Sequence, residues 1–209
     1  MTEHSDFETT VTHDMQHWLQ QAVIGLNLCP FAKSVLVRQQ IHFVVSRANG
    51  PDQLEPVLLR ELQALADADP GLRDTTLLMA PDCLLAFRDF NEFLHRADHC
   101  LELLSLQGVI QIASFHPQFQ FAGTGKNDIS NFTNRAPYPT LHLLRESSVD
   151  RAVAAFPQAE EIFEHNIDTM RQLGQGGWDA LGIVRNAPVA PLAAGKPGKG
   201  GSRRGTIGR

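Results

Sequence analysis

Residues 41–46 read IHFVVS, residues 75–80 read TTLLMA and residues 109–115 read VIQIASF. Each run is short and apolar, and each is followed by a turn signal such as Pro or Asn-Gly, which predicts three strands. Between the runs, apolar residues recur at three- and four-residue steps over 54–66 and 87–104, which predicts two helices. This alternation predicts an α/β fold with crossover helices.

The flanking regions predict more helices, one more strand and a long loop. Apolar stripes predict helices over about 5–27, 147–156 and 158–173, and residues 140–145 (TLHLLR) predict a fourth strand. Residues 116–139 show little periodicity and exceed the usual length of a connection, so they form a loop that is either functional or disordered. We expect one α/β domain with a three- to four-stranded, mostly parallel sheet and a long loop after the third strand.

Charge is divided unevenly along the chain. The 209 residues carry 18 basic and 23 acidic side chains, for a net charge of −5. Residues 185–209 hold six basic residues and no acidic one, so residues 1–184 carry a net charge of −11. An acidic body repels phosphate backbones, so we expect no nucleic acid partner beyond weak contacts through the tail. Residues 1–184 are the expected domain, and the Gly- and Pro-rich residues 185–209 are an expected disordered basic tail.

Composition is typical of a soluble cytoplasmic protein. No apolar run approaches the roughly 18 residues that a membrane span needs, and residues 1–10 lack the pattern of a secretory signal. Cys29, Cys83 and Cys100 are too few and too scattered for a disulfide framework. We therefore expect a cytoplasmic location.

Polar residues follow the three predicted strands at the ends where α/β sheets bind ligands. If the strands are parallel, Arg47, Asp82 and His116 lie along one edge of the sheet. An imidazole titrates near neutral pH, so we interpret His116 as a catalytic acid or base that Asp82 orients. The alternative is a structural role, in which the ring caps the end of the strand by a hydrogen bond to a backbone carbonyl.

The long loop supplies groups that can bind an anion. Arg135 can hold a carboxylate or phosphate through two hydrogen bonds, with Lys126 or Arg47 as a second cation. Hydrogen bonds to the substrate would come from Tyr138, Asn134 and Asn131. The alternative for Arg135 is an ion pair with a structural carboxylate. These residues together predict a hydrolase- or transferase-type enzyme that acts on a small anionic molecule.

Two other hypotheses remain open. Cys29, His116 and His142 could bind zinc or iron, because three N and S ligands leave an open position on such a metal. An antiparallel first helix would, however, place Cys29 near the opposite strand ends. The other hypothesis is a non-catalytic ligand sensor or assembly module, whose long loop docks a partner.

Three segments of the chain resemble a known family. They are residues 27–31 (NLCPF), 108–117 (GVIQIASFHP) and 134–146 (NRAPYPTLHLLRE). Together they resemble an uncharacterised bacterial family of domains of unknown function, over about residues 10–183. The resemblance implies membership and a bacterial cytoplasmic setting, but no reaction. Ala136 departs from the pattern, in which Ser is more frequent at this position.

Overall fold

The computed structural model describes residues 2–155 and 161–188 of the chain. In chain order, the elements are α1 (Thr2–Trp18), η1 (Leu19–Ile24), α2 (Ala32–Val37), β1 (Ile41–Val45), α3 (Pro51–Asp67), β2 (Thr75–Met79), α4 (Phe87–Leu103), β3 (Ile110–Phe115), η2 (Ile129–Asn134), β4 (Thr140–Arg145), α5 (Glu146–Ala155) and α6 (Ile162–Ala180). The predicted α/β class is confirmed.

The strands form one mixed sheet in the order β1-β2-β4-β3. β1 and β2 are parallel, whereas β4 pairs antiparallel with β2 on one side and with β3 on the other. β1, β2 and β3 therefore run in one direction and end at the same edge, which we call the carboxyl edge. β4, the predicted fourth strand, enters the sheet at this edge and makes the sheet mixed.

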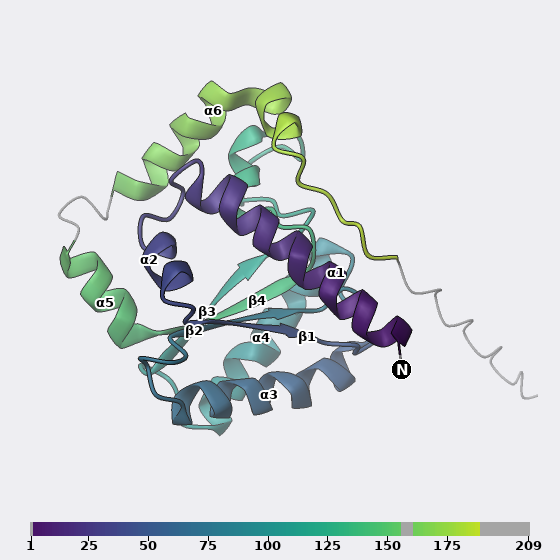
Figure 1. Ribbon diagram of the computed structural model, residues 1–209, viewed down its shortest axis with the longest axis vertical. Coiled ribbons are helices and arrows are strands. Elements are labelled where there is room, and N and C mark those ends of the chain that lie inside the picture. Colours follow the sequence, from purple (N-terminus) through teal and green to yellow (C-terminus); the bar gives the residue numbers. More distant parts are fainter. Residues whose placement is uncertain (1, 156–160, 189–209) are drawn as a thin grey trace, which may run out of the picture.

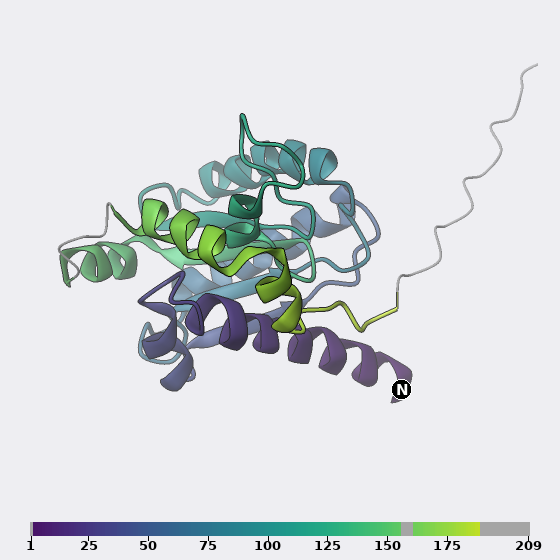
Figure 2. The same ribbon diagram turned by 90° about the horizontal axis from the view of Figure 1, so that it is seen from above.

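Helices cover both faces of the sheet (Figures 1 and 2). α3 and α4 lie on one face, where the buried leucines of α3 join β2 and β4 in a hydrophobic core. α1 and α6 cover the other face, around a second core that contains Met15, Trp18 and Tyr138. All five residues of β2 are buried, because this strand has a neighbour on each side and helices above and below.

Two of the predicted helices differ from the structure. The predicted helix over 5–27 is divided into α1 and η1, a π-helical segment. α6 continues beyond Gly174, whose positive φ of 64° kinks the helix and allows Trp178 to pack edge-on against Phe132, with ring centroids 5.1 Å apart. Phe156, the predicted end of the helix over 147–156, lies outside the described residues.

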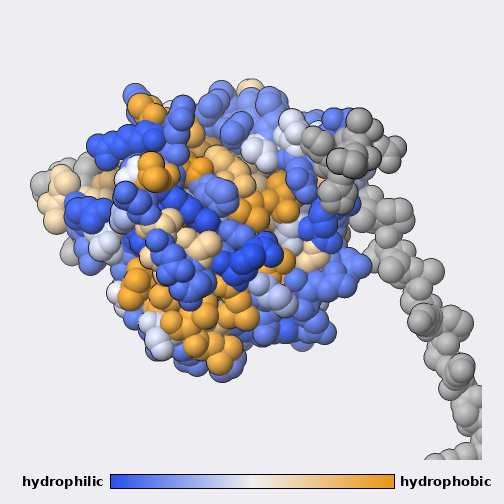
Figure 3. Space-filling model, turned by 60° about the horizontal axis from the view of Figure 1, so that its bottom comes forward, coloured by the Kyte–Doolittle hydropathy of each residue, from blue (hydrophilic) through white to orange (hydrophobic). Residues whose placement is uncertain are grey.

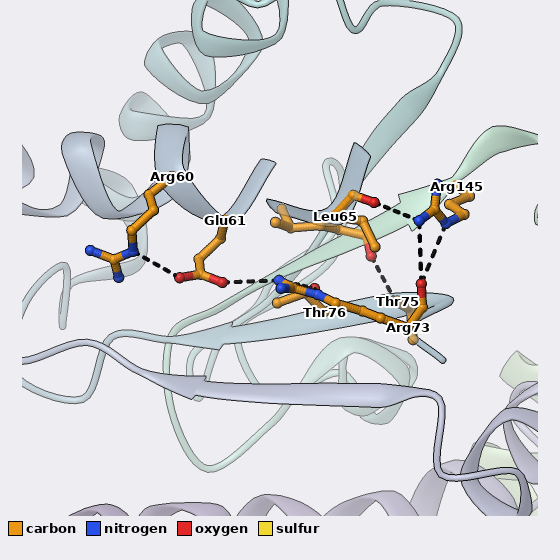
Figure 4. Close-up of polar contacts among 8 residues, drawn as sticks. Arg60, Glu61, Leu65, Arg73, Thr75, Thr76 and Arg145 are labelled. Atoms are coloured by element: carbon orange, nitrogen blue, oxygen red, sulfur yellow. Dashed lines mark hydrogen bonds and ion pairs between the residues drawn. The ribbon is translucent and has the colours of Figure 1, made fainter. Parts of the chain in front are cut away.

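Arg145, at the end of β4, joins this strand to the C-terminal end of α3 (Figure 4). Its buried guanidinium donates to the main-chain oxygens of Leu65 and Ala68 at 2.5 and 2.6 Å. These carbonyls end α3, where the helix leaves acceptors without partners and where a cation is favourable. Glu61 of the same helix is also buried and pairs with Arg73 at 2.9 Å.

The surface is a mixture of polar and apolar side chains. Figure 3 views the molecule from the side of α3, and an orange apolar area lies on this face beside blue polar residues. Exposed large apolar residues include Leu72, Leu103 and Val109. Among the described helices, none is long and apolar enough to span a membrane.

Replacing Arg145 by Met should lower the free energy of unfolding by about 3 kcal/mol, because the carbonyls of Leu65 and Ala68 lose the charged donor that Arg145 supplies. The matched control is Arg88→Met, since Arg88 forms an exposed pair with Glu92 and should contribute less than about 0.5 kcal/mol. Urea unfolding measures both. Equal losses for the two variants would contradict the capping role.

Candidate functional site at the carboxyl edge

The carboxyl edge brings together residues that are distant in the sequence. Its centre is the β2–α4 loop, residues 81–84, which three side chains from other parts of the chain hold in place. These contacts are Arg185 Nη2 to the Pro81 oxygen at 2.9 Å, Arg47 Nε to Asp82 Oδ2 at 3.1 Å and His116 Nε2 to the Leu84 oxygen at 3.0 Å.

His116 is fully buried, and both of its ring nitrogens are occupied by main-chain groups. The amide of Gln118 donates to Nδ1 at 2.9 Å, so Nε2 carries the proton that it donates to the oxygen of Leu84. Burial lowers the pKa of this imidazole, against the opposing effect of the Leu84 hydrogen bond. The structure therefore favours the structural role of His116 as a cap at the end of the strand. It gives no support to a role in acid–base catalysis.

The loop that His116 holds has an unusual backbone. Leu84 has a φ of 55°, in the left-handed region that a branched side chain adopts only at a cost in energy. The hydrogen bond from His116 stabilises this conformation, and the Phe87 and Phe90 rings enclose the imidazole at centroid distances of 5.4 and 5.1 Å. His116 thus positions the loop.

Arg47 and Asp82 lie at one edge, as the strand-end rule predicts, and they form an ion pair with each other. The Asp82 side chain is almost completely buried, and the guanidinium of Arg47 also lies 3.7 Å above the centre of the Phe7 ring. Among the described residues, no hydrogen bond joins Asp82 to His116. Asp82 therefore does not orient the imidazole, as the sequence had predicted it would. Its Oδ1 atom is buried and has no partner among the described residues.

Arg135 and Asn131 fold the long loop onto itself. Arg135 donates to the main-chain oxygens of Phe119 and Lys126 at 3.2 and 2.7 Å, and burial lowers its pKa. Asn131 is fully buried and bonds the amide of Phe121 and the oxygen of Gly125, both at 2.9 Å. Arg135, the predicted anion clamp, therefore donates to main-chain carbonyl groups. The alternative prediction, an ion pair with a structural carboxylate, is not what the structure shows.

Tyr138 is fully buried and takes part in a clamp on residues 185–188, which are the first residues of the predicted tail. Its hydroxyl donates to Asp14 Oδ2 at 2.5 Å and accepts from the Ala187 amide at 3.1 Å. Asn186 donates to the same carboxylate through its amide and its side chain, at 2.8 and 2.6 Å. Burial and the bond to Asp14 raise the pKa of Tyr138. The rest of the predicted tail, 189–209, lies outside the described residues.

The remaining predicted residues are separated. Asn134 bonds Thr133 and the Ser114 oxygen, whereas Lys126 is exposed in the loop. Cys29 lies in the turn before α2, and His142 lies within β4, where its Nε2 is 2.6 Å from the Thr75 hydroxyl. Within the described chain, no three His, Cys, Asp or Glu side chains gather as metal ligands. The predicted metal set is therefore not assembled.

A pocket of about 410 Å³ opens beside the β2–α4 loop, where α3 and α4 begin. One wall is formed by Cys83 and Leu84, and another by residues 49–51 at the start of α3. The lining residues contributed by α4 are Asp89, Glu92, Phe93 and Arg96. Burial and the nearby Asp82 raise the pKa of the Cys83 thiol to about 11, so it stays protonated at neutral pH.

Sequence reasoning missed several residues that shape this edge. Asp14 had a readable signal, because it lies between Val11 and Trp18 on the apolar stripe of α1, and a carboxylate there needs buried donors. Leu84 gave no signal, since a leucine at positive φ is not encoded by residue type. Arg185 lies in a stretch whose composition predicts a disordered tail.

The fold and the site together define an α/β protein with a mixed sheet and a pocket at its carboxyl edge. The chain belongs to the family described as protein of unknown function (DUF1415), whose model matches residues 10–180. No curated protein and no solved structure matches the chain.

The protein should become less stable as the pH is lowered, because of His142. Burial lowers its pKa to about 4, so between about pH 6.5 and 4 the unfolded state binds a proton that the folded state does not. The free energy of unfolding should therefore decrease by up to about 3 kcal/mol as the pH falls through this range. Urea unfolding from pH 7 to 4 measures the slope, which His142→Gln should reduce without abolishing it, because the pKa of His116 is lowered as well. An NMR titration of His142 near its ordinary value would contradict this.

Replacing Tyr138 by Phe should release residues 185–188 from the body. The Asp14 carboxylate and the Ala187 amide each lose a buried partner, which should lower the free energy of unfolding by about 1–3 kcal/mol. Hydrogen exchange should accelerate most at the amides of Asn186 and Ala187. The matched control is Met15→Leu, which changes the same core and leaves every hydrogen bond of the clamp in place. Unchanged exchange at the two amides would show that the clamp does not hold this segment.

Proposed function

We propose that this chain is a small-molecule-binding protein whose ligand occupies the pocket between the beginnings of α3 and α4. The observation that carries the proposal is a pocket of about 410 Å³ whose wall contains a residue in a strained conformation, Leu84. This volume lies in the lower part of the range of small-molecule sites. Strained backbone is retained where the surroundings impose it, and such residues cluster at ligand sites.

The position of the pocket supports the same proposal. In open α/β sheets, ligands bind beyond the carboxyl ends of the parallel strands. The pocket lies after β1 and β2, which are the parallel pair of this sheet. The bracing by Arg47, His116 and Arg185 holds its wall in place, and a preformed wall lowers the entropy cost of binding.

Binding is better supported than catalysis. A hydrolase or transferase needs an activated nucleophile or a general base near its substrate. Cys83, the thiol in the pocket wall, has a raised pKa, and His116 directs both ring nitrogens to the main chain. We therefore favour a ligand-sensing or ligand-carrying role over the enzyme that the strand-end residues predicted.

Gly50→Trp should abolish ligand binding without unfolding the protein. Gly50 lines the pocket, its φ of −173° suits any residue, and a Cβ there would meet no atom within 4 Å. The control is Gly125→Trp, which has equal space in the long loop but does not line the pocket. Fragments that shift the NMR signals of Leu84 and Phe93 should lose binding only in the first variant. Equal binding to both variants would refute the proposal.

A further inference from the structure

We infer that β1 is a pairing surface for a second copy of this chain, with the two β1 strands antiparallel across a twofold axis. β1 (Ile41–Val45) is one margin of the sheet, because the strand order is β1-β2-β4-β3. Figure 1 shows this strand with α1 above it and α3 below. The inference concerns this margin and does not depend on the ligand proposed for the pocket.

Alternate main-chain groups of β1 point away from the sheet. The bonds to β2 come from even-numbered residues, such as the oxygen of Gln40 and the amide of Ser46. Successive residues of a strand direct these groups to opposite sides, so those of Ile41, Phe43 and Val45 point outward. Within the described chain, no hydrogen bond joins these outward amides and oxygens to another residue. They are therefore available to another strand.

The opposite margin of the sheet is partly occupied. There Asn134 holds the end of β3, since its main-chain oxygen accepts from the His116 amide at 3.2 Å and its side chain donates to the Ser114 oxygen at 3.4 Å. Edge strands are also commonly protected by a charged side chain, a proline or a bulge. β1 reads IHFVV, with no proline and no Lys, Arg, Asp or Glu, and it pairs with β2 in continuous register. Its sequence therefore contains nothing that prevents pairing.

β1 is complementary to a copy of itself. In an antiparallel pair centred on Phe43, Ile41 of one copy is opposite Val45 of the other, and opposite residues exchange main-chain hydrogen bonds. These three side chains lie on the face of the sheet that packs against the core under α1, so apolar residues meet apolar residues there. Identical surfaces that meet about a twofold axis form the commonest kind of protein dimer. A second copy therefore fits this margin.

Exposed apolar side chains widen the surface beyond the strand. Val37, at the end of α2, is 73% exposed, and Leu72 is 77% exposed. Leu72 lies beside the start of β1, because Gln40 donates to the main-chain oxygen of Gly71 at 3.0 Å. A stable interface needs more area than a strand of five residues supplies, and these side chains add to it.

The charges at the two ends of β1 are complementary in the same arrangement. Antiparallel pairing brings the beginning of one β1 to the end of the other. The exposed Arg38 lies before the strand. Beyond its end, Arg47 contacts the Phe7 ring of α1, and the exposed Asp6 is the adjoining residue of that helix. The twofold axis therefore brings each Arg38 towards Asp6 of the other copy.

Sedimentation and amide hydrogen exchange of the full chain measure this pairing. The chain should form a dimer in which the amides of Ile41, Phe43 and Val45 exchange more slowly than in dilute, monomeric protein. Val45→Pro should raise the dissociation constant of the dimer at least about tenfold, because each copy loses an outward donor. It removes no bond to β2, which is where a proline is tolerated in an edge strand. The matched control is Val45→Ala, which keeps the amide and should leave the dimer in place.

The two exposed charges give a second test that leaves the strand unchanged. Arg38→Glu and Asp6→Arg should each weaken the dimer a few-fold at low salt, and the double variant should restore it. If Val45→Pro fails to fold, this exchange decides, and no recovery in the double variant would overturn the pairing. A chain that stays monomeric at every concentration would also overturn it. So would a dimer with unprotected outward amides, or equal dissociation constants for Val45→Pro and Val45→Ala.

Discussion

One hydrogen bond, from the imidazole of His116 to the oxygen of Leu84, fixes the loop beside the pocket in which we propose that a ligand binds. It joins the end of β3 to the loop after β2, two strands that are not neighbours in the sheet because β4 lies between them. It also holds Leu84 at a positive φ, and Leu84 forms a wall of the pocket. Without this bond, the loop would lose a contact that holds Leu84 in its left-handed conformation.

The other polar groups of the carboxyl edge serve the same purpose. Arg135 and Asn131 fold the long loop onto itself, and Tyr138 with Asp14 fixes residues 185–188, from which Arg185 reaches Pro81. Buried polar groups are costly unless they are bonded, so this dense network makes the edge stiff. Its stiffness leaves the pocket as a preformed space.

The sequence predicted the fold more fully than the site, for a physical reason. Apolar periodicity reports which face of an element is buried, so the strands and the class of fold could be read directly from it. The antiparallel pairing of β4 could not be read in this way, because its apolar residues suit either direction. The strand-end rule did bring Arg47, Asp82 and His116 to one edge.

The roles of those residues could not be read from the chain, because a side chain that bonds a carbonyl group looks the same in sequence as one that binds a substrate. His116 and Arg135 have the right chemistry for catalysis and anion binding, yet the main chain uses their donors. The pocket was invisible for a related reason, since it is formed by Gly50, by the backbone of Leu84 and by one face of α4. None of these is a motif.

The most direct test is the protonation state of the His116 ring, observed by ¹⁵N NMR of the full chain between pH 5 and 8. The account predicts a neutral ring with its proton on Nε2 at neutral pH, and no change until the pH falls below the ordinary range of histidine. A ring that titrates near pH 6.5 with its proton exchanging freely with water would contradict it. In that case the loop would not be held by His116, and the imidazole would again be available for catalysis.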